Sequence, residues 1–223
     1  MKTKIGFLTI GMAPRPELVN WVPDEFTVLE NGVLNEIPQN RWCDFYPDQG
    51  DDLLYTKARD QEIKISAKKI EPCLEQAGAS LIARGAQILV VLCSAPLPRF
   101  KSKVPLLLPH NLIRSLIDRM LPWGTMGLLA PDPRQENMMR ANWETEGRKI
   151  IFTSHLPYSR EELLPDQLNL LKKCDLILAD CFGYDVSFRV SFQGQITAPV
   201  LLVREVTMVF LQQLQGFKRK NNY

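Results

Sequence analysis

Short apolar segments alternate with amphipathic helical stretches along most of this chain, and that alternation constrains its fold more than any other feature. Several segments are continuous runs of Val, Ile and Leu, which is typical of parallel strands covered on both faces by helices. The expected strands are Lys4–Ile10, Phe26–Glu30, Leu53–Thr56, Ile88–Cys93, Val104–Leu108, Met126–Ala130, Lys149–Thr153, Leu176–Asp180 and Val200–Val203. Strands alternating with helices predict an α/β fold with mainly parallel sheets.

Apolar stripes at helical spacing fill the intervals between these strands. Asp132 supplies an N-cap, followed by Pro133 at the first helical position and Gln135 at the third, so a helix is expected there. Pro72 either kinks its stripe or marks the true start of that helix. The irregular segment Asn31–Asp52 is either a lid over a site or an insertion packed on the surface. The stripes cover Ala67–Leu81, Leu112–Met120, Met139–Trp143 and Val206–Leu214.

Charge and composition exclude several classes of partner. The net charge of +2 gives no reason to expect nucleic acid or a membrane, and the basic run Lys218–Lys220 reads as a solvated end. The N-terminal apolar stretch is short and runs into Gly11 and Pro14, so a first strand explains it better than a signal peptide. Five cysteines, an odd number without tight spacing, argue against a disulfide framework. We therefore expect a cytoplasmic protein with reduced thiols.

Several common chemistries lack their motifs. The chain has no G-x-G-x-x-G, no G-x-x-x-x-G-K-[ST] and no G-x-S-x-G. Its only histidines are His110 and His155, with no C-x-x-C or H-x-x-x-H, so no metal site is expected. His155 follows Ser154 at the end of an expected strand and could reach a cleft, although a lone histidine is more often structural.

Two cysteines remain as candidates for chemistry. Cys93 and Cys181 each end an expected strand, and ligands of parallel α/β sheets bind beyond the carboxyl ends of the strands. They lie 88 residues apart, which suggests two similar halves with one thiol each, facing a shared cleft. A thiol near free backbone N–H groups can act as a base, and a pair can remove a proton and return it on the opposite side. Each is alternatively a small buried hydrophobic residue.

The same segments resemble those of the AroM family, in the right order and over most of the chain. The segments that carry the resemblance are Leu8–Gly11, Pro14–Arg15, Leu54–Thr56, Leu92–Ser94, Leu129–Pro131 and Asp180–Tyr184. AroM proteins in turn resemble the aspartate/glutamate/hydantoin racemase superfamily. That resemblance implies two pseudo-symmetric lobes, each a mainly parallel sheet flanked by helices, with a cleft between them. The lobes would comprise residues 1–97 plus 204–223, and residues 98–203.

The resemblance also implies a site. Cys93 and Cys181 would be the acid and the base, without a cofactor or metal, and the expected ligand is a small carboxylate. Arg15 is the first candidate for an anion clamp and Arg204 the second. Relatives usually carry glycine before the second cysteine, whereas this chain has Asp180, whose carboxylate disfavours a thiolate unless it points away. The candidate binding residues are Thr9, Gly11, Arg15, Thr56, Ser94, Ala95, Pro131, Ser154, Phe182, Gly183 and Tyr184.

Three functions remain open at this stage. The first is a cofactor-independent racemase, isomerase or related lyase acting at a carbon next to a carboxylate. The second is a binding or regulatory protein that keeps the cleft without the chemistry. The third is a single-thiol enzyme that pairs Cys181 with His155. Formation of a homo-oligomer is left open as well.

Overall fold

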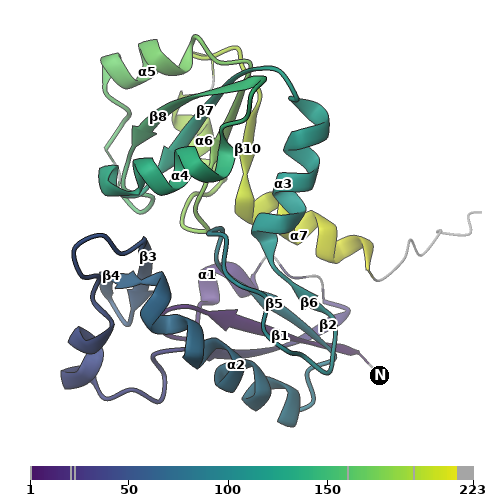
Figure 1. Cartoon of the computed structure of the whole chain (residues 1–223). Helices are drawn as coiled ribbons and strands as arrows, with labels where there is room; N and C mark the ends of the chain where they lie inside the picture. The colour runs from purple at the N-terminus through teal and green to yellow at the C-terminus, as the bar shows by residue number, and fades with distance from the viewer. Residues whose placement is uncertain (1, 21, 23, 160, 193, 215–223) are drawn as a thin grey trace, which may run out of the picture.

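The computed structural model describes residues 2–20, 22, 24–159, 161–192 and 194–214, and the basic run at 218–220 lies outside these ranges. Two lobes, each built on a four-stranded parallel sheet, lie one above the other in Figure 1. The alternation of strands and helices in the sequence therefore predicted the fold class correctly.

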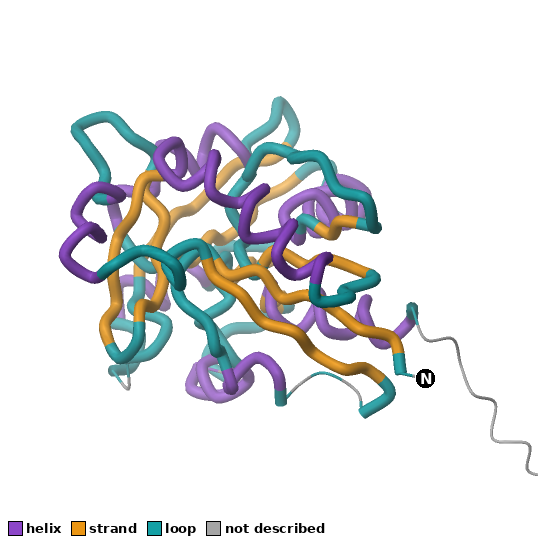
Figure 2. Tube along the Cα trace, turned by 90° about the horizontal axis from the view of Figure 1, so that it is seen from below, coloured by secondary structure: helices purple, strands orange, loops and turns teal. Residues whose placement is uncertain are grey.

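The first sheet has the strand order β2-β1-β5-β6, with all neighbours parallel. Its strands are β1 (Thr3–Thr9), β2 (Phe26–Gly32), β5 (Ile88–Val91) and β6 (Leu106–Leu107). The central strands β1 and β5 are the apolar runs of the sequence, and helix α2 (Ala67–Ala83) packs across them. Figure 2 views this lobe from below and shows a helix crossing the strands.

The second sheet repeats the topology of the first. Its order is β10-β9-β7-β8, so β7 takes the place of β1, β8 that of β2, β9 that of β5 and β10 that of β6. The strands are β7 (Gly124–Ala130), β8 (Arg148–Ser154), β9 (Leu176–Ala179) and β10 (Val200–Leu202). The two halves expected from the cysteine spacing are thus present as two matching sheets.

A β-hairpin interrupts this symmetry. β3 (Leu53–Ala58) was expected as a strand, but it pairs antiparallel with β4 (Gln61–Ser66), which the sequence reading missed. The turn lies at Arg59 and Asp60, where Arg59 has a φ of 57°. Because arginine and not glycine occupies this left-handed position, no turn signal could be read there from the sequence.

The remaining elements are mostly helices that cover the two sheets. α2 is capped by the Ser66 hydroxyl, which accepts from the Lys69 N–H at 3.4 Å, and it continues through Pro72. The other helices are α1 (Pro16–Val19), η1 (Gln39–Phe45), α3 (Pro109–Met120), η2 (Pro133–Gln135), α4 (Glu136–Trp143), α5 (Pro165–Leu171), α6 (Val186–Phe192) and α7 (Val203–Gln213). Asp132 and Gln135 form the expected capping box, although a 3-10 turn (η2) precedes α4.

One buried cluster joins the lobes. Phe7 and Val90 of the first sheet belong to the same core as Met126 and Leu178 of the second, together with Leu211 of α7. Each fully buried side chain of this kind contributes about 1.5–3 kcal/mol to folding. The packed cluster therefore fixes the carboxyl ends of β5 and β9 relative to one another.

The segment between β2 and β3 is packed rather than extended. Trp42 and Phe45 of η1 are buried in the core of the first lobe, and η1 contacts α2. The first sheet continues beyond residue 97, because β6 pairs with β5. The lobe boundaries given above stay a prediction. None of the helices within the described ranges is long and apolar enough to cross a membrane.

Candidate active site

The two candidate cysteines occupy equivalent places in the two sheets. Cys93 lies two residues after the end of β5, and Cys181 lies two residues after the end of β9. The Ser94 hydroxyl donates a hydrogen bond of 3.1 Å to the main-chain carbonyl of Asp180. Because these residues adjoin the cysteines, the two cysteine Cα atoms are at most about 12 Å apart. The strand ends that carry the thiols therefore converge.

The loop around Cys181 is tightly held. The Gly183 N–H donates to the Cys181 Sγ at 3.4 Å. Arg204, at the start of α7, donates from Nε to the Phe182 carbonyl at 2.7 Å and from Nη2 to the Gly183 carbonyl at 3.1 Å. Arg204 is buried and uses these two nitrogens to fix the loop. Its position thus differs from that of the free anion clamp for which it was the second candidate.

Burial suppresses the ionisation of both thiols. It raises the pKa of Cys93 to about 12. The Ala95 N–H lowers this pKa, and the charges of Cys181 and Asp180 raise it. Burial raises the pKa of Cys181 to about 11, opposed by the Gly183 N–H and by the positive charges of Arg15 and Arg204. Burial therefore favours the protonated form of both thiols.

Asp180 directly precedes Cys181, its charge disfavours both thiolates, and it is only 3% exposed. Its Oδ2 accepts from the Trp143 indole N–H at 2.8 Å, while its Oδ1 has no hydrogen-bond partner among the described residues. Burial raises the pKa of this carboxyl to about 6. His110 packs on the Trp143 ring, and its Nδ1 donates to the Ser94 carbonyl at 3.1 Å because a carbonyl can only accept.

Arg15, the first candidate for an anion clamp, is buried and already paired. Its Nε donates to the Glu17 carboxylate at 2.7 Å, and its Nη2 donates to the Tyr158 hydroxyl at 2.7 Å. Although burial opposes it, Arg15 lowers the pKa of Glu17 below its usual range. Arg15 also affects the pKa of Cys181, so the guanidinium and the thiol belong to one electrostatic neighbourhood.

The candidate residues of the first lobe gather at the end of β1. The Gly11 N–H donates to the Thr9 hydroxyl at 3.3 Å. A Cβ on Gly11 would lie 2.4 Å from the Thr56 Oγ1 and 2.1 Å from the Lys57 carbonyl oxygen, so only glycine fits against the hairpin. Thr9, Gly11 and Thr56 are thus brought together. Ala95 follows Ser94 and is half-buried.

The candidate residues of the second lobe lie at equivalent strand ends. Pro131 is buried directly after β7, and Ser154 ends β8 with its carbonyl accepting from the Gln167 side chain at 2.6 Å. Phe182 belongs to the core that joins the lobes. The fully buried Tyr184 donates its hydroxyl to the His155 carbonyl at 2.5 Å.

The side chain of His155 contacts residues other than the two cysteines. Its Nε2 lies 2.9 Å from the Glu161 carbonyl, and its ring packs on Phe188 at 5.1 Å between centroids. Within the ranges that the structure describes, no hydrogen bond joins His155 to Cys181. The single-thiol pairing of these two residues therefore receives no support from the geometry.

Two residues near Cys181 were missed by the sequence reading. Tyr158, between β8 and α5, crosses to the first lobe, where Arg15 bonds its hydroxyl and the Lys57 Nζ lies 3.5 Å from its ring centroid. The strand-end rule that selected Ser154 could have been extended along the same loop to Tyr158. Lys57 lies inside β3, and no strand-end signal marks it.

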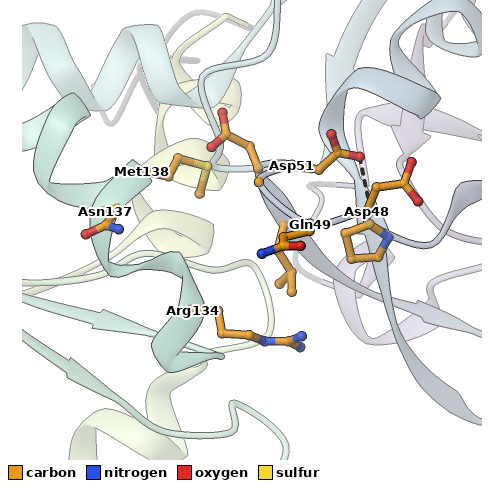
Figure 3. A pocket seen from close by; sticks show the side chains of 10 residues that line it. Asp48, Gln49, Asp51, Arg134, Asn137 and Met138 are labelled. Atoms are coloured by element: carbon orange, nitrogen blue, oxygen red, sulfur yellow. Dashed lines mark hydrogen bonds between the residues drawn. The ribbon is translucent and has the colours of Figure 1, made fainter.

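Several cavities formed by the described residues have linings that include neither Cys93 nor Cys181. One of about 510 Å³ lies between the 47–53 loop and Arg134, Asn137 and Met138 (Figure 3). On its acidic side, the Asp48 N–H donates to the Asp51 carboxylate at 3.2 Å. None of its lining residues is a candidate site residue. Among the described residues, no three His, Cys, Asp or Glu side chains gather as metal ligands.

Structural comparison identifies proteins of the same fold. Arylmalonate decarboxylase superposes with a TM-score of 0.61 at 12% identity, covering 93% of this chain and 91% of that chain. An aspartate racemase homologue from Pyrococcus horikoshii gives 0.53 at 13% identity, covering 97% and 100%. A putative Asp/Glu racemase from Yersinia pestis gives 0.52 at 12%, covering 95% and 100%. At these identities the likeness shows the fold, which is the racemase-like one expected from the sequence.

Sequence comparison is more specific. No curated protein matches the chain. The family model described as "AroM protein" matches residues 5–214, which includes both cysteine loops and every candidate binding residue. The chain belongs to the AroM family.

Proposed function

We propose that this protein is a cofactor-independent racemase, isomerase or related lyase acting at a carbon next to a carboxylate. In this proposal Cys181 is the base and Cys93 the acid, one from each lobe. The observation that carries it is the hydrogen bond between Ser94 and the Asp180 carbonyl, which joins the neighbours of the two cysteines. Proteins of the same fold named aspartate racemase homologue and arylmalonate decarboxylase add support.

The proposed chemistry needs one thiolate and one thiol. The Cys181 thiolate takes the proton from the substrate carbon, and the electron pair passes into the neighbouring carboxylate. The Cys93 thiol then returns a proton to the opposite side of the same carbon. The Gly183 N–H, which donates to the Cys181 Sγ at 3.4 Å and favours its thiolate, supports the role of Cys181 as the base. In a lyase, a thiol protonates the carbanion left when carbon dioxide departs.

Substrate carboxylate binding is the second part of the proposal. Arg15 supplies the charge, because its guanidinium lies within electrostatic range of Cys181. The Ala95 and Gly183 N–H groups, which favour the two thiolates, are placed to stabilise negative charge that develops beside each sulfur.

The alternative is a non-catalytic protein that binds a small carboxylate. Two observations favour it: burial favours the protonated form of both thiols, and Arg15 is already paired with Glu17. A binding protein needs the cleft and the cation but neither thiolate.

One experiment separates the two functions. Amino acids, hydantoins and substituted malonates are incubated with the protein in deuterated water, and incorporation at the carbon next to the carboxylate, or next to the ring carbonyl of a hydantoin, is followed by NMR. Melting temperatures with each compound are measured in parallel. The enzyme proposal expects incorporation with at least one compound. Thermal stabilisation that survives replacement of both cysteines, without incorporation from any compound, favours the binding protein.

A further inference from the structure

Tyr158 is a side chain of the second lobe held by two cations of the first. Its hydroxyl accepts from the Arg15 Nη2 at 2.7 Å, and the Lys57 ammonium lies 3.5 Å from its ring centroid. A cation over an aromatic face and a hydrogen bond from a charged donor are both attractive, so both contacts hold the ring in this position. The phenol therefore bridges the lobes at Arg15.

The ring also packs on the loop that carries Cys181. A Cβ on Gly183 would lie 3.0 Å from the Tyr158 Cζ and 2.7 Å from Pro157, so glycine at this position allows the aromatic ring to approach the loop. Burial raises the pKa of Tyr158, and the charge of Cys181 acts in the same direction. The side chain is thus a neutral phenol packed on the loop that carries Cys181.

Two cavities flank this contact. One of about 300 Å³ is lined by residues 12–17 with Lys57, Arg59 and Asp60. Another of about 550 Å³ is lined by residues 157–159 with Lys57, Asp185 and Phe188. Lys57 lines both, so the contact between Lys57 and Tyr158 forms part of the wall between them. Movement of the ring into the larger cavity would join the two.

We propose that Tyr158 is a specificity-determining residue that occupies the carboxylate position of Arg15 until a carboxylate ligand replaces it. The phenol oxygen accepts from Nη2 where a ligand oxygen would, and Glu17 already holds Nε. A ligand carboxylate outcompetes a neutral phenol for a guanidinium because it carries a full negative charge. A neutral ligand of the same size lacks this advantage. The inference rests on the proposed function only in taking the ligand to be a carboxylate.

The test compares two reagents that alkylate the same thiolate. Iodoacetate carries a carboxylate next to its reactive carbon, and iodoacetamide is its neutral analogue. Modification of Cys181 is followed at pH 9 by peptide mass spectrometry. Cys174, which precedes β9 whereas Cys181 follows it, serves as the internal reference. The ratio of the iodoacetate rate to the iodoacetamide rate cancels the thiolate fraction and reports the carboxylate preference.

Tyr158→Phe removes the phenol oxygen and keeps the ring. We expect its iodoacetate-to-iodoacetamide ratio at Cys181 to rise about tenfold, the equivalent of one hydrogen bond to a charged group. Adding Arg15→Gln should abolish that gain. Tyr55→Phe is the matched control, because the Tyr55 hydroxyl bonds Glu62 and not Arg15, and its ratio should stay at the wild-type value. Equal acceleration of both reagents, or no change, would overturn the proposal.

A second variant covers the case in which Tyr158→Phe does not fold. Tyr158→Leu also removes the phenol oxygen and leaves both Arg15 and Lys57 in place, so it should raise the same ratio about tenfold; an unchanged ratio would contradict the proposal. These measurements need no turnover. A raised ratio without deuterium exchange on any substrate would therefore refute the proposed enzymatic function and support the role of Tyr158. Deuterium exchange with an unchanged ratio would support the enzymatic function and refute the role of Tyr158.

Discussion

Replacing Asp180 with asparagine isolates the cost of burying one carboxylate beside two thiols. The pKa of this carboxyl rises from 3.8 to about 6 in the folded protein, and burial is the cause. The folded state therefore binds more protons than the unfolded state between these values, so stability falls as the pH rises from about 4 to 6 and is level above. The shift corresponds to about 3 kcal/mol of lost stability at pH 7. Asp180→Asn cannot ionise, so it escapes this loss.

Urea denaturation at a series of pH values measures the effect. The amide oxygen of Asp180→Asn can still accept from Trp143, and any fixed cost of the new NH₂ group is the same at every pH. The free energy of unfolding of the variant minus that of the wild type should therefore increase with pH, by roughly 1–2 kcal/mol between pH 5 and 7.5. A difference that is constant over this range would refute the assignment of Asp180 as a buried carboxyl of raised pKa.

Three other substitutions give direct tests of the site and its frame. Arg15→Gln removes a positive charge that lowers the pKa of Cys181, so alkylation of this thiol by iodoacetamide at pH 9 should slow several-fold while that of Cys174 is unaffected. If Cys181 reacts equally fast in the variant and the wild type, the charge of Arg15 does not act on this thiol. Gly11→Ala brings a Cβ within 2.1 Å of the Lys57 carbonyl oxygen and should cost about 1–3 kcal/mol in urea denaturation, whereas an unchanged midpoint would show that the contact is loose. Arg148→Met should cost about 3 kcal/mol or more, because the buried guanidinium bonds the Trp143 and Leu121 carbonyls and Asp118; a loss below about 1 kcal/mol would argue against it.

The parts of the fold that follow from local pattern could be predicted. Each expected strand is present, because continuous apolar runs are typical of buried parallel strands and nothing in their neighbourhood overrides them. The partner of β3 could not be predicted. β4 has the alternating pattern of a hairpin strand, but the Arg59 turn lacks the glycine or asparagine that would have marked it.

The candidate site shows the same division. The strand-end rule located Cys93 and Cys181, since it depends only on where the runs stop. The role of Arg204 in holding the Cys181 loop could not be inferred, because it depends on how α7 begins against the Phe182 and Gly183 carbonyls. Tyr158 was missed because its contact with Arg15 spans 143 residues and two lobes. The strand-end rule can point to the loop that carries Tyr158, but the partner of Tyr158 follows only from tertiary packing.

The central claim is that one thiol from each lobe moves protons at a single carbon. Deuterium incorporation into an accepted substrate tests it most directly, in the wild type, in Cys93→Ser, in Cys181→Ser and in the matched control Cys174→Ser, whose buried thiol lies outside the cysteine loops. We predict that each loop variant loses about 10²–10⁴-fold of the racemisation or isomerisation rate while the control keeps it. Turnover with incorporation that persists when Cys93 and Cys181 are both replaced would contradict the account.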